Sequence, residues 1–265
     1  MSSYYSGKTI WITGASSGIG EEIAYQTAAH GARLILSARR EQELKRVAEG
    51  CTGAADVMIV PMDLASEQSV REAAALVLSK VKNVDILFNN GGISQRALTL
   101  DTSLDIVRKM FEVNFFSNVL LSQLVANRMI ENKSGHIVVT SSLMGKWGFY
   151  LRSTYAATKH ALHGFYDSMR MENEQHGLYI TLLTPGFINT NVSKNALNEK
   201  GISTGEMDNN QAQGMSAKEC VRICLHGVAK KKFEVAAGGS ELLGLKLKRF
   251  LPGMFEKILR KRSAQ

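Results

Sequence analysis

The sequence has few cysteines and no long apolar stretch. Its three cysteines, Cys51, Cys220 and Cys224, are too few for a disulfide framework. Cys220 and Cys224 share one face of a predicted helix, so we expect buried thiols rather than a metal pair. The N-terminal residues contain no apolar run, and no stretch approaches the roughly 18 apolar residues of a membrane span. These absences argue against a secretory leader and a spanning helix, and they favour a cytoplasmic protein.

Excess charge is also scarce over most of the chain, although the formal net charge is +8. Residues 242–265 carry seven basic side chains against Glu256 alone, so this tail holds +6 of that total. The remainder gives little support to nucleic-acid binding. The tail mixes apolar and basic residues, which is typical of segments that lie on anionic membranes, and Pro252-Gly253 divides it in two. A solvated tail or an oligomer contact is the alternative.

No internal repeat, low-complexity tract or linker interrupts the chain. We therefore predict one domain over residues 1–241, followed by the basic amphipathic tail at 242–265. Short apolar runs alternate with helical patterns, which indicates an α/β fold: a doubly wound (Rossmann) parallel sheet of about seven strands with helices on both faces. The predicted strands are 8–13, 32–37, 56–60, 84–88, 136–140, 178–183 and 233–236. The main predicted helices are 21–30, 40–49, 67–80, 103–131 and 153–174.

Three glycines follow the first predicted strand in a G-x-x-x-G-x-G pattern, Gly14, Gly18 and Gly20. Glycine allows a tight turn and a close approach of backbone to ligand, and the N-terminus of the following helix attracts a pyrophosphate. The pattern differs from the G-x-G-x-x-G of the standard dinucleotide fingerprint, and a purely structural turn is the alternative. The strand–turn–helix context favours a dinucleotide site.

The end of the second predicted strand lacks an acidic residue. An acid about twenty residues past the glycine turn would bind the ribose 2′-hydroxyl of NAD, whereas arginine accommodates a 2′-phosphate. Here the strand ends in Ser37-Ala-Arg39-Arg40, and the planar fork of arginine suits phosphate. Arg39 and Arg40 therefore predict that NADP(H) is preferred over NAD(H), mainly through Arg39. The alternative is that both arginines begin a solvated helix face.

Tyr155 and Lys159 are four residues apart at the start of a predicted helix, so their side chains share one face. A phenol has an ordinary pKa of about 10, and a nearby ammonium lowers that pKa because it favours the phenolate. A shift to about 7 takes about 4 kcal/mol and would suit a general acid/base. A surface Tyr and Lys at a common helical spacing is the alternative for this pair alone.

Several motifs in order strengthen the enzymatic interpretation. They are Thr13-Gly-Ala-Ser-Ser-Gly-Ile-Gly20, Asn89-Asn-Gly-Gly92, Ser142, Tyr155-x-x-x-Lys159 and Pro185-Gly186. Together they resemble the short-chain dehydrogenases/reductases over residues 7–236, in the single-domain branch of about 250 residues. Within that branch, the segments at 89–96, 101–105 and 215–225 are similar to the dehydrogenase/reductase member 7 group.

The resemblance implies four catalytic residues. Tyr155 would be the proton donor and acceptor, and Lys159 would lower its pKa and hold the nicotinamide ribose. Ser142, rather than the adjacent Ser141, would hydrogen-bond the substrate oxygen. Asn114 would anchor a helix kink and a water leading to Lys159. No metal is implied. The implied cofactor contacts are Gly14, Ser16, Ser17, Gly18, Ile19, Gly20, Arg39, Arg40, Asp63, Leu64, Asn90, Gly91, Tyr155, Lys159, Pro185, Gly186, Ile188 and Thr190.

Two residues depart from the family pattern. Gly91 replaces the usual alanine, but its backbone contact with the cofactor would survive. Thr158 replaces the usual serine and keeps its hydroxyl. Neither change puts the chemistry in doubt, because hydride transfer to a carbonyl builds negative charge on oxygen that Ser142 and Tyr155 could stabilise.

Two loops border the predicted site. Trp147, Phe149 and Tyr150 are candidates for the wall of an apolar pocket, or they pack elsewhere. The polar stretch 191–213 is long for a loop, so we expect a substrate lid at about 189–215, with a flexible insertion as the alternative. His160 and His163 are expected to serve helix packing or solvation.

The sequence thus predicts an NADP-dependent oxidoreductase that interconverts a ketone or aldehyde and an alcohol. From the resemblance, its substrate would be a small apolar or cyclic carbonyl compound or alcohol, and the protein would be a homodimer or homotetramer. The competing interpretations are a non-catalytic NADP-binding sensor on the same fold, and a basic nucleic-acid or membrane adaptor that rests on the tail alone.

Overall fold

A computed structural model describes residues 2–263; Met1, Ala264 and Gln265, at the ends of the predicted domain and tail, lie outside the described residues. One parallel sheet of seven strands has the order β3-β2-β1-β4-β5-β6-β9. The doubly wound α/β prediction is confirmed. Both ends of each predicted strand lie within two residues of the ends of an observed strand. The strands are β1 Thr9–Thr13, β2 Arg33–Ser37, β3 Asp56–Ile59, β4 Ile86–Asn89, β5 Gly135–Thr140, β6 Leu178–Pro185 and β9 Glu234–Ala237.

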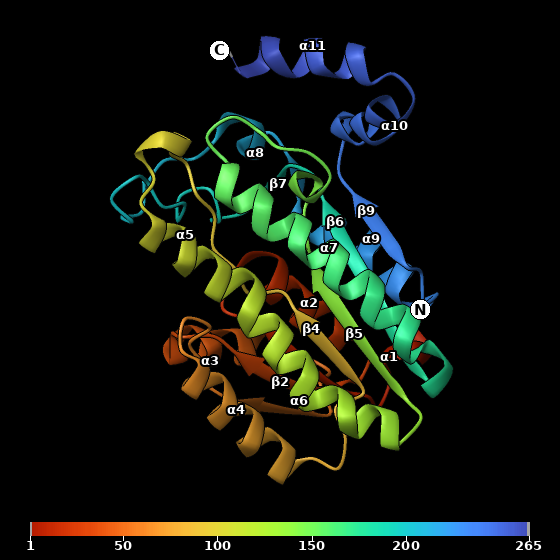
Figure 1. Ribbon diagram of the computed structural model, residues 1–265. Helices are drawn as coiled ribbons and strands as arrows, with labels where there is room; N and C mark the ends of the chain where they lie inside the picture. Colours follow the sequence, from red (N-terminus) through yellow and green to blue (C-terminus); the bar gives the residue numbers. More distant parts are fainter. Residues whose placement is uncertain (1, 264–265) are drawn as a thin grey trace.

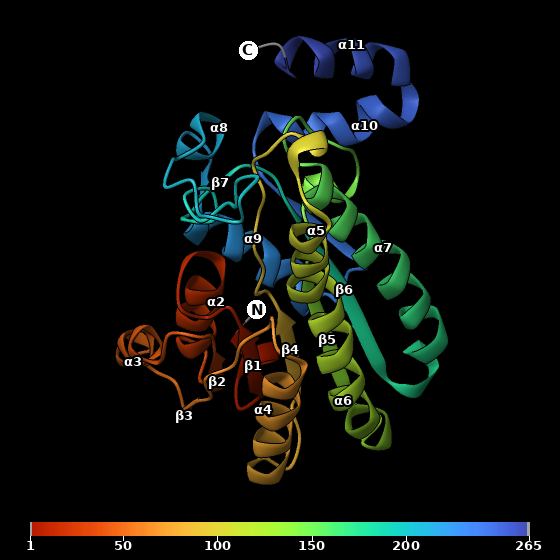
Figure 2. The ribbon, with the colours of Figure 1, turned by 60° about the vertical axis from the view of Figure 1, so that its left-hand side comes forward.

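Helices cover both faces of this sheet (Figures 1 and 2). Helices α2, α3 and α9 pack on one face, and α4, α6 and α7 pack on the other. Successive strand residues alternate between the faces, so Ile10 and Ile12 belong to the first core and Trp11 to the second. The helices are α1 Ser2–Tyr5, α2 Gly18–Ala28, α3 Glu41–Gly50, α4 Glu67–Lys80, α5 Leu104–Phe111, α6 Ser117–Glu131, α7 Ser153–Asn173, α8 Asn209–Ala212, α9 Ala217–Ala229, α10 Leu243–Phe250 and α11 Pro252–Ser263.

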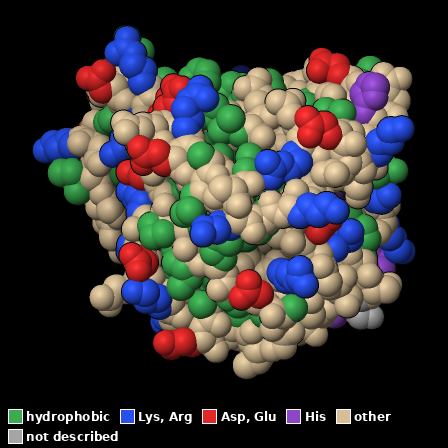
Figure 3. Space-filling view, turned by 90° about the horizontal axis from the view of Figure 1, so that it is seen from below, with side chains coloured by type: hydrophobic (Ala, Val, Ile, Leu, Met, Phe, Trp, Pro, Cys, Tyr) green, Lys and Arg blue, Asp and Glu red, His purple; other side chains and the backbone are tan. Residues whose placement is uncertain are grey.

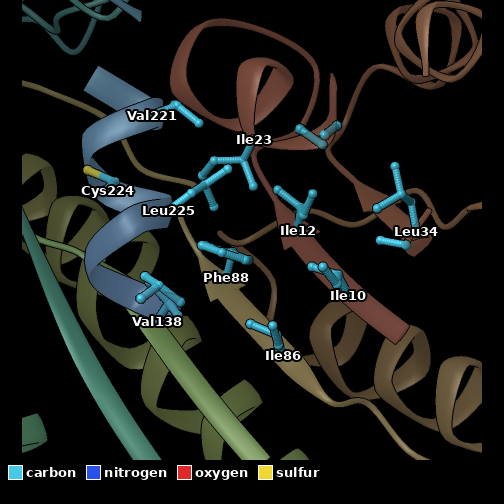
Figure 4. Packing of buried hydrophobic residues seen from close by; sticks show 14 of the residues in the cluster. Ile10, Ile12, Ile23, Leu34, Ile86, Phe88, Val138, Val221, Cys224 and Leu225 are labelled. Carbon is cyan, nitrogen blue, oxygen red and sulfur yellow. The ribbon is translucent and has the colours of Figure 1, made fainter. Parts of the chain in front are cut away.

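Helix α9 explains two of the three cysteines. Cys220 and Cys224 are 1% and 2% exposed and face the sheet together with Val221 and Leu225. Figure 4 shows this helix lying against Phe88 and Val138, beside Ile23 of α2. The expectation of buried thiols is confirmed, because these side chains fill the core on this face.

The long helix predicted at 103–131 contains an irregular turn. Residues Glu112–Phe116 form a π-helical segment between α5 and α6, and Asn114 lies within it, fully buried. Such single π turns occur frequently at functional sites. The kink expected at Asn114 is therefore present, and it brings the side chain of Asn114 toward α7.

The carboxyl ends of the strands are covered by two segments. The predicted lid contains short strands β7 (Ile188–Asn189) and β8 (Met215–Ser216), with α8 between them. The predicted tail forms α10 and α11, which stand above this end of the sheet (Figure 1). On the face seen from the opposite end, basic and acidic side chains are interspersed (Figure 3). None of the described helices is long and apolar enough to cross a membrane.

Candidate active site

One large cavity lies at the carboxyl ends of the strands. Its volume is about 1160 Å³, and it extends from the turn after β1 to helices α10 and α11. Of the predicted site residues, all but Gly20 and Asn114 line it. Gly20 packs behind the turn, where an added Cβ would lie 2.3 Å from the carbonyl oxygen of Gly14. Gly20 therefore supports the turn from behind, and its predicted contact with the cofactor stays a prediction.

The glycine turn has the shape that a dinucleotide phosphate requires. Gly14 and Gly18 have φ angles of +65° and +61°, a region that favours glycine. A Cβ on Gly14 would lie 2.6 Å from the Cα of Gly91, so the two backbones approach closely. The turn leads directly into the N-terminus of α2, which favours an anion. Arg46 of α3, which the sequence analysis missed, supports the turn through a 3.3 Å hydrogen bond from Nη2 to the Ser16 carbonyl.

The two predicted selectivity residues are available to a ligand. Arg39 and Arg40 follow β2, line the cavity and are exposed. Within residues 2–263, neither guanidinium forms an ion pair, whereas Arg46 nearby is paired with Glu21 and Glu43. Two unpaired guanidinium groups at this position could hold a phosphate.

Two further strand ends line the same side of the cavity as the glycine turn. Asp63 and Leu64 follow β3, and the Asp63 carboxylate accepts a 2.9 Å hydrogen bond from the Ala65 amide. The cavity is also lined by Pro185, the last residue of β6, and by Gly186, Ile188 and Thr190 beyond it. Glu241, which no sequence pattern singled out, holds this loop because its Oε1 accepts hydrogen bonds from the Phe187 and Gly239 amides at 2.9 and 3.0 Å.

Asn90 and Gly91 join β1 to β4 beneath the cavity. Both backbone amides donate to Thr13 Oγ1 at 3.0 Å, and Asn90 Oδ1 accepts from Thr140 Oγ1. A Cβ on Gly91 would lie 2.5 Å from Cδ1 of Leu64, the far end of a flexible side chain. The departure from alanine at Gly91 thus makes room for Leu64.

Tyr155 and Ser142 meet inside the cavity. Burial raises the pKa of the Tyr155 phenol above its ordinary value of 10.0, while a hydrogen bond with Ser142 and the positive charge of Arg152 act in the opposite direction. Burial prevails, so the predicted net lowering of this pKa is wrong for the protein alone. The neighbouring Ser141 turns away, because its hydroxyl donates to the Lys159 carbonyl. The geometry favours Ser142 as the serine of the site.

Lys159 and Asn114 are held by backbone groups. Lys159 Nζ donates to the Thr140 carbonyl at 2.7 Å and lies 5.6 Å from the centre of the Tyr155 ring. Burial lowers the pKa of Lys159 to about 8. Asn114 bonds both the amide and the carbonyl of Ile93, at 2.8 and 2.9 Å, and donates to Thr158 Oγ1 at 3.1 Å. The Thr158 hydroxyl thus makes a contact that the hydroxyl of the usual serine could also make.

A polar network behind the serine loop escaped the sequence analysis. His163 contacts Ser141 Oγ at 3.0 Å through Nε2, and Nδ1 lies 3.2 Å from Lys146 Nζ. Lys146 is also paired with Glu234 of β9 at 2.8 Å. Burial first, and then Lys146, lower the pKa of His163 to about 4. The expected packing role of His163 is correct. His160 is exposed, and its Nδ1 donates to the Ala156 carbonyl at 2.8 Å.

The other half of the cavity is mainly apolar. Trp147 and Phe149 line it as predicted, whereas Tyr150 is 51% exposed and is not part of its wall. Trp147 is enclosed by Gly244 of α10 and by Phe255 of α11, whose ring lies 5.1 Å away. Residues of the predicted lid also line the cavity, among them Val192 and Leu197. Further apolar lining comes from α10 and α11: Leu243, Leu247, Phe250, Leu251, Met254, Ile258 and Leu259.

The tail is therefore part of the cavity wall. The predicted division of the chain into a domain at 1–241 and a tail at 242–265 stays a prediction. Amphipathic periodicity shows that a segment has an apolar face without showing what that face covers, so the position of the tail does not follow from its sequence.

Comparisons with known proteins agree with this geometry. The short chain dehydrogenase family matches residues 8–201. Human dehydrogenase/reductase SDR family member 7 is 40% identical over 232 residues, which span 85% of this chain and 68% of the relative. Family member 7B of Mus musculus is 36% identical over 266 residues, which span 98% of this chain and 82% of the relative.

Solved structures share the fold over most of their length. A short-chain dehydrogenase from Streptomyces avermitilis is 25% identical, with a TM-score of 0.79 over 97% of this chain and 99% of its own. Another, from Sphingobium yanoikuyae in complex with NADPH, is also 25% identical, with a TM-score of 0.76 over 86% and 87%. The chain belongs to the short-chain dehydrogenase/reductase family. It is an oxidoreductase of a family that uses NAD or NADP.

Proposed function

We propose that the protein is an NADP-dependent oxidoreductase that interconverts a ketone or aldehyde and an alcohol. The observation that carries the proposal is that Ser142, Tyr155 and Lys159 line the same cavity that the glycine turn borders. A bound nicotinamide cofactor would supply or accept the hydride. The pair of exposed guanidiniums at Arg39 and Arg40 supports NADP over NAD.

The chain's own residues would perform the proton chemistry. Ser142 and Tyr155 would donate hydrogen bonds to the substrate oxygen as it gains negative charge. Burial raises the pKa of the Tyr155 phenol and so favours its protonated form, which can act as a proton donor. Lys159, fixed by the Thr140 carbonyl, would hold the ribose hydroxyls. Asn114 would fix the position of Ile93 relative to α7.

The lining of the cavity supports a small apolar carbonyl compound or alcohol as the substrate. The far half of the cavity is walled in part by Trp147, Phe149 and Phe255, with leucines of α10. Burial of apolar surface contributes about 25 cal/mol per Å². Binding energy would therefore come from the body of the substrate, while Ser142 and Tyr155 would orient its carbonyl group.

The proposal is tested by NADPH oxidation with a panel of ketones, quinones and steroid- or retinoid-like carbonyl compounds. Replacement of Tyr155 by Phe removes the acid/base and leaves the ring, so turnover should fall by about 10²–10⁴-fold with NADPH binding retained. The matched control is Tyr150→Phe, which removes an exposed hydroxyl outside the cavity and should turn over normally.

Two results would count against the proposed function. If the wild type binds NADPH tightly and turns over no compound of the panel, the alternative of a non-catalytic NADP sensor on this fold is favoured, and the search moves to partners. If Tyr155→Phe keeps full turnover on a compound that the wild type uses, another residue supplies the proton.

We further propose a homodimer or homotetramer built on α7 and on α5 and α6, which run end to end beside it (Figure 1). This arrangement is supported by Leu104 of α5, Met171 of α7 and Phe116 of the π-helical segment, which are 67%, 77% and 52% exposed. Apolar side chains on an exposed helix face are typical of a contact between subunits.

We also propose that the protein is cytoplasmic and rests on an anionic membrane through α10 and α11. Phe250, Leu251 and Met254 are 72%, 53% and 48% exposed there. Exposed basic residues accompany them, among them Lys246 and Lys257. A surface with both features would bind anionic lipid. All three cysteines are free thiols, in keeping with a reducing compartment.

A further inference from the structure

His163 is a buried histidine that the proposed proton chemistry does not use. It stands on α7 one turn after Lys159, so the two side chains share one side of the helix. Lys159 and Tyr155 line the cavity, whereas His163 does not and is 9% exposed. Its contacts reach instead into the serine loop, residues 141–146, which carries Ser142.

The partners of the His163 ring fix which of its nitrogens carries the hydrogen. A lysine ammonium can only donate, and Lys146 Nζ lies 3.2 Å from Nδ1, so Nδ1 is the acceptor of the ring. Nε2 then carries the hydrogen and donates to Ser141 Oγ at 3.0 Å. This direction suits Ser141, because its own hydroxyl donates to the Lys159 carbonyl at 3.2 Å. The hydrogen bonds therefore run in one direction, from Lys146 through His163 to Ser141.

Lys146 is itself held by the last strand of the sheet. Its Nζ lies 2.8 Å from Oε2 of Glu234 in β9. The other carboxylate oxygen of Glu234 accepts from Thr184 Oγ1 of β6 at 2.6 Å. A lysine paired in this way keeps its ammonium beside Nδ1, so the sheet maintains the hydrogen on Nε2 of His163.

The serine loop packs closely against the same turn of α7. A Cβ added to Gly145 would lie 2.6 Å from Ser141 Oγ and 2.9 Å from both Cδ2 of His163 and the Lys159 carbonyl oxygen. On the side of the sheet, the Ser141 amide donates to the Leu183 carbonyl at 2.8 Å. The backbone of Ser141 is thus tied to the sheet, and its hydroxyl is tied to α7 through His163 and Lys159.

Ser142 follows Ser141 directly. Its backbone is extended, with φ −168° and ψ 163°, and its Oγ accepts from the Met144 amide at 3.1 Å. Because the two serines are adjacent, a shift of Ser141 relative to α7 also moves Ser142. Tyr155 belongs to α7 and lines the cavity together with Ser142. The contact between Ser141 and α7 therefore sets the separation of the two hydroxyls that would bind the substrate oxygen.

We propose that His163 is a positioning residue for Ser142. By donating from Nε2 to Ser141, the ring holds the serine loop on α7 and fixes the Ser142 hydroxyl relative to Tyr155. This role rests on the proposed function, in which Ser142 and Tyr155 bind the substrate oxygen. His163 itself acts from outside the cavity, through its neighbour Ser141.

Two substitutions separate the hydrogen bond from packing. His163→Leu keeps a bulky side chain and removes the donor, so kcat should fall about tenfold, since a displacement of about 1 Å can cost up to about 10²-fold. His163→Gln returns an N–H donor near the position of Nε2 and should restore most of the lost kcat. NADPH affinity should stay unchanged in both. The matched control is His160→Leu, which removes an exposed histidine of the same helix and should leave kcat unchanged.

The same substitution is then made in a chain that lacks the Ser142 hydroxyl. Because His163 would act through Ser142 alone, adding His163→Leu to Ser142→Ala should cost less than about twofold in kcat. A general loss of packing would cost the same factor in both backgrounds. The readout is NADPH oxidation with a carbonyl compound of the panel that the wild type reduces. Equal factors in the two backgrounds, or a His163→Gln variant as slow as His163→Leu, would overturn the proposal.

A second measurement needs no substrate. The Met144 amide donates to Ser142 Oγ, so its exchange with solvent reports where that hydroxyl lies. NMR of the full chain with saturating NADP⁺ should show exchange about fivefold faster in His163→Leu, and close to the wild-type rate in His163→Gln and His160→Leu. An unchanged rate in His163→Leu would refute the positioning role.

The wild type alone supplies a third check. In the ¹⁵N spectrum of the histidine rings, the signal missing from His163→Gln should show a hydrogen on Nε2 and none on Nδ1 at about pH 7. The opposite arrangement refutes the proposal even if His163→Leu fails to fold. A wild type that turns over no compound of the panel would count against the proposed function, whereas the exchange rate and the ring spectrum still decide the role of His163.

Discussion

At the scale of single residues, Arg39 is the one on which the cofactor preference depends. It follows β2, lines the cavity and has no ion-pair partner within the described residues. We expect NADPH to bind at least about tenfold tighter than NADH, and Arg39→Ala to remove most of that difference by weakening NADPH alone. Titration of the purified protein with each cofactor, followed by calorimetry, measures both affinities.

Arg33 offers a matched control, because it is an exposed arginine at the opposite end of the same strand. Arg33→Ala should leave both affinities unchanged. Equal binding of NADPH and NADH by the wild type, or unchanged NADPH binding by Arg39→Ala, would refute the role of this residue.

Tyr155 shows the limit of reasoning from spacing at this scale. The spacing of four residues places Lys159 on the correct helix face, and the ammonium does lie 5.6 Å from the ring centre. Spacing does not report burial, and burial raises the pKa of the phenol by more than the nearby charges lower it. Nor does spacing report Arg152 as a second cation, since its burial depends on distant partners.

At the scale of elements, α10 and α11 have a predicted role outside the cavity. The apolar residues Phe255 and Leu247 pack inward, whereas Phe250 and the basic residues Lys257 and Lys261 are exposed. We expect the protein to co-sediment with phosphatidylserine vesicles and not with phosphatidylcholine vesicles. Lys257→Glu combined with Lys261→Glu should weaken this binding at least tenfold, because each basic residue contributes about 1 kcal/mol near an anionic surface.

The matched control reverses a charge elsewhere: Lys80→Glu alters an exposed lysine at the end of α4 and should not change sedimentation. These substitutions are preferable to removal of the tail, since Phe255 encloses Trp147 and its loss would open the cavity. Sedimentation that is equal for both lipids would contradict the proposed membrane contact.

At the scale of the whole molecule, buried histidines determine how stability depends on pH. His136 lies in the sheet, where Thr181 Oγ1 donates to the Lys232 carbonyl and therefore accepts from His136 Nε2 at 2.8 Å. The other ring nitrogen then accepts from Tyr4 Oη at 2.7 Å. Burial first, and then Lys231 and Lys8, lower the pKa of His136 from 6.5 to about 3.

The sign of the effect follows from these two pKa values. Below about pH 6.5 the unfolded chain binds a proton at His136 that the folded protein refuses until about pH 3. The free energy of unfolding should therefore fall as the pH falls, by about 1.4 kcal/mol per unit from this group. Urea unfolding at about pH 7 and pH 5 should show a loss about 2 kcal/mol smaller in His136→Asn than in the wild type.

His176→Gln is the control for this prediction. His176 is exposed at the end of α7, so its replacement should leave the pH dependence of the wild type intact. If His136→Asn keeps the wild-type dependence as well, the loss of stability arises from other groups, of which His163 is the next in order of burial.

The sequence by itself determined the sheet, the helices around it, the glycine turn and the residues at the strand ends. These are local signals, because apolar runs, helical periodicity and glycine positions each depend on residues that are close together in the chain. Because parallel strands bring their carboxyl ends to one edge of the sheet, the sequence alone predicts that motifs far apart in the chain form a single site.

Only the tertiary structure decided what surrounds that site. The ion pair of Arg152 with Asp208 joins residues 56 positions apart, and Lys146 and Glu234 are separated by 88. The apolar face of the tail covers the cavity through Trp147 and Phe255, which no periodicity could place together. The pKa of Tyr155 likewise depends on burial and on distant charges, because electrostatic interactions follow distance in space and not along the chain.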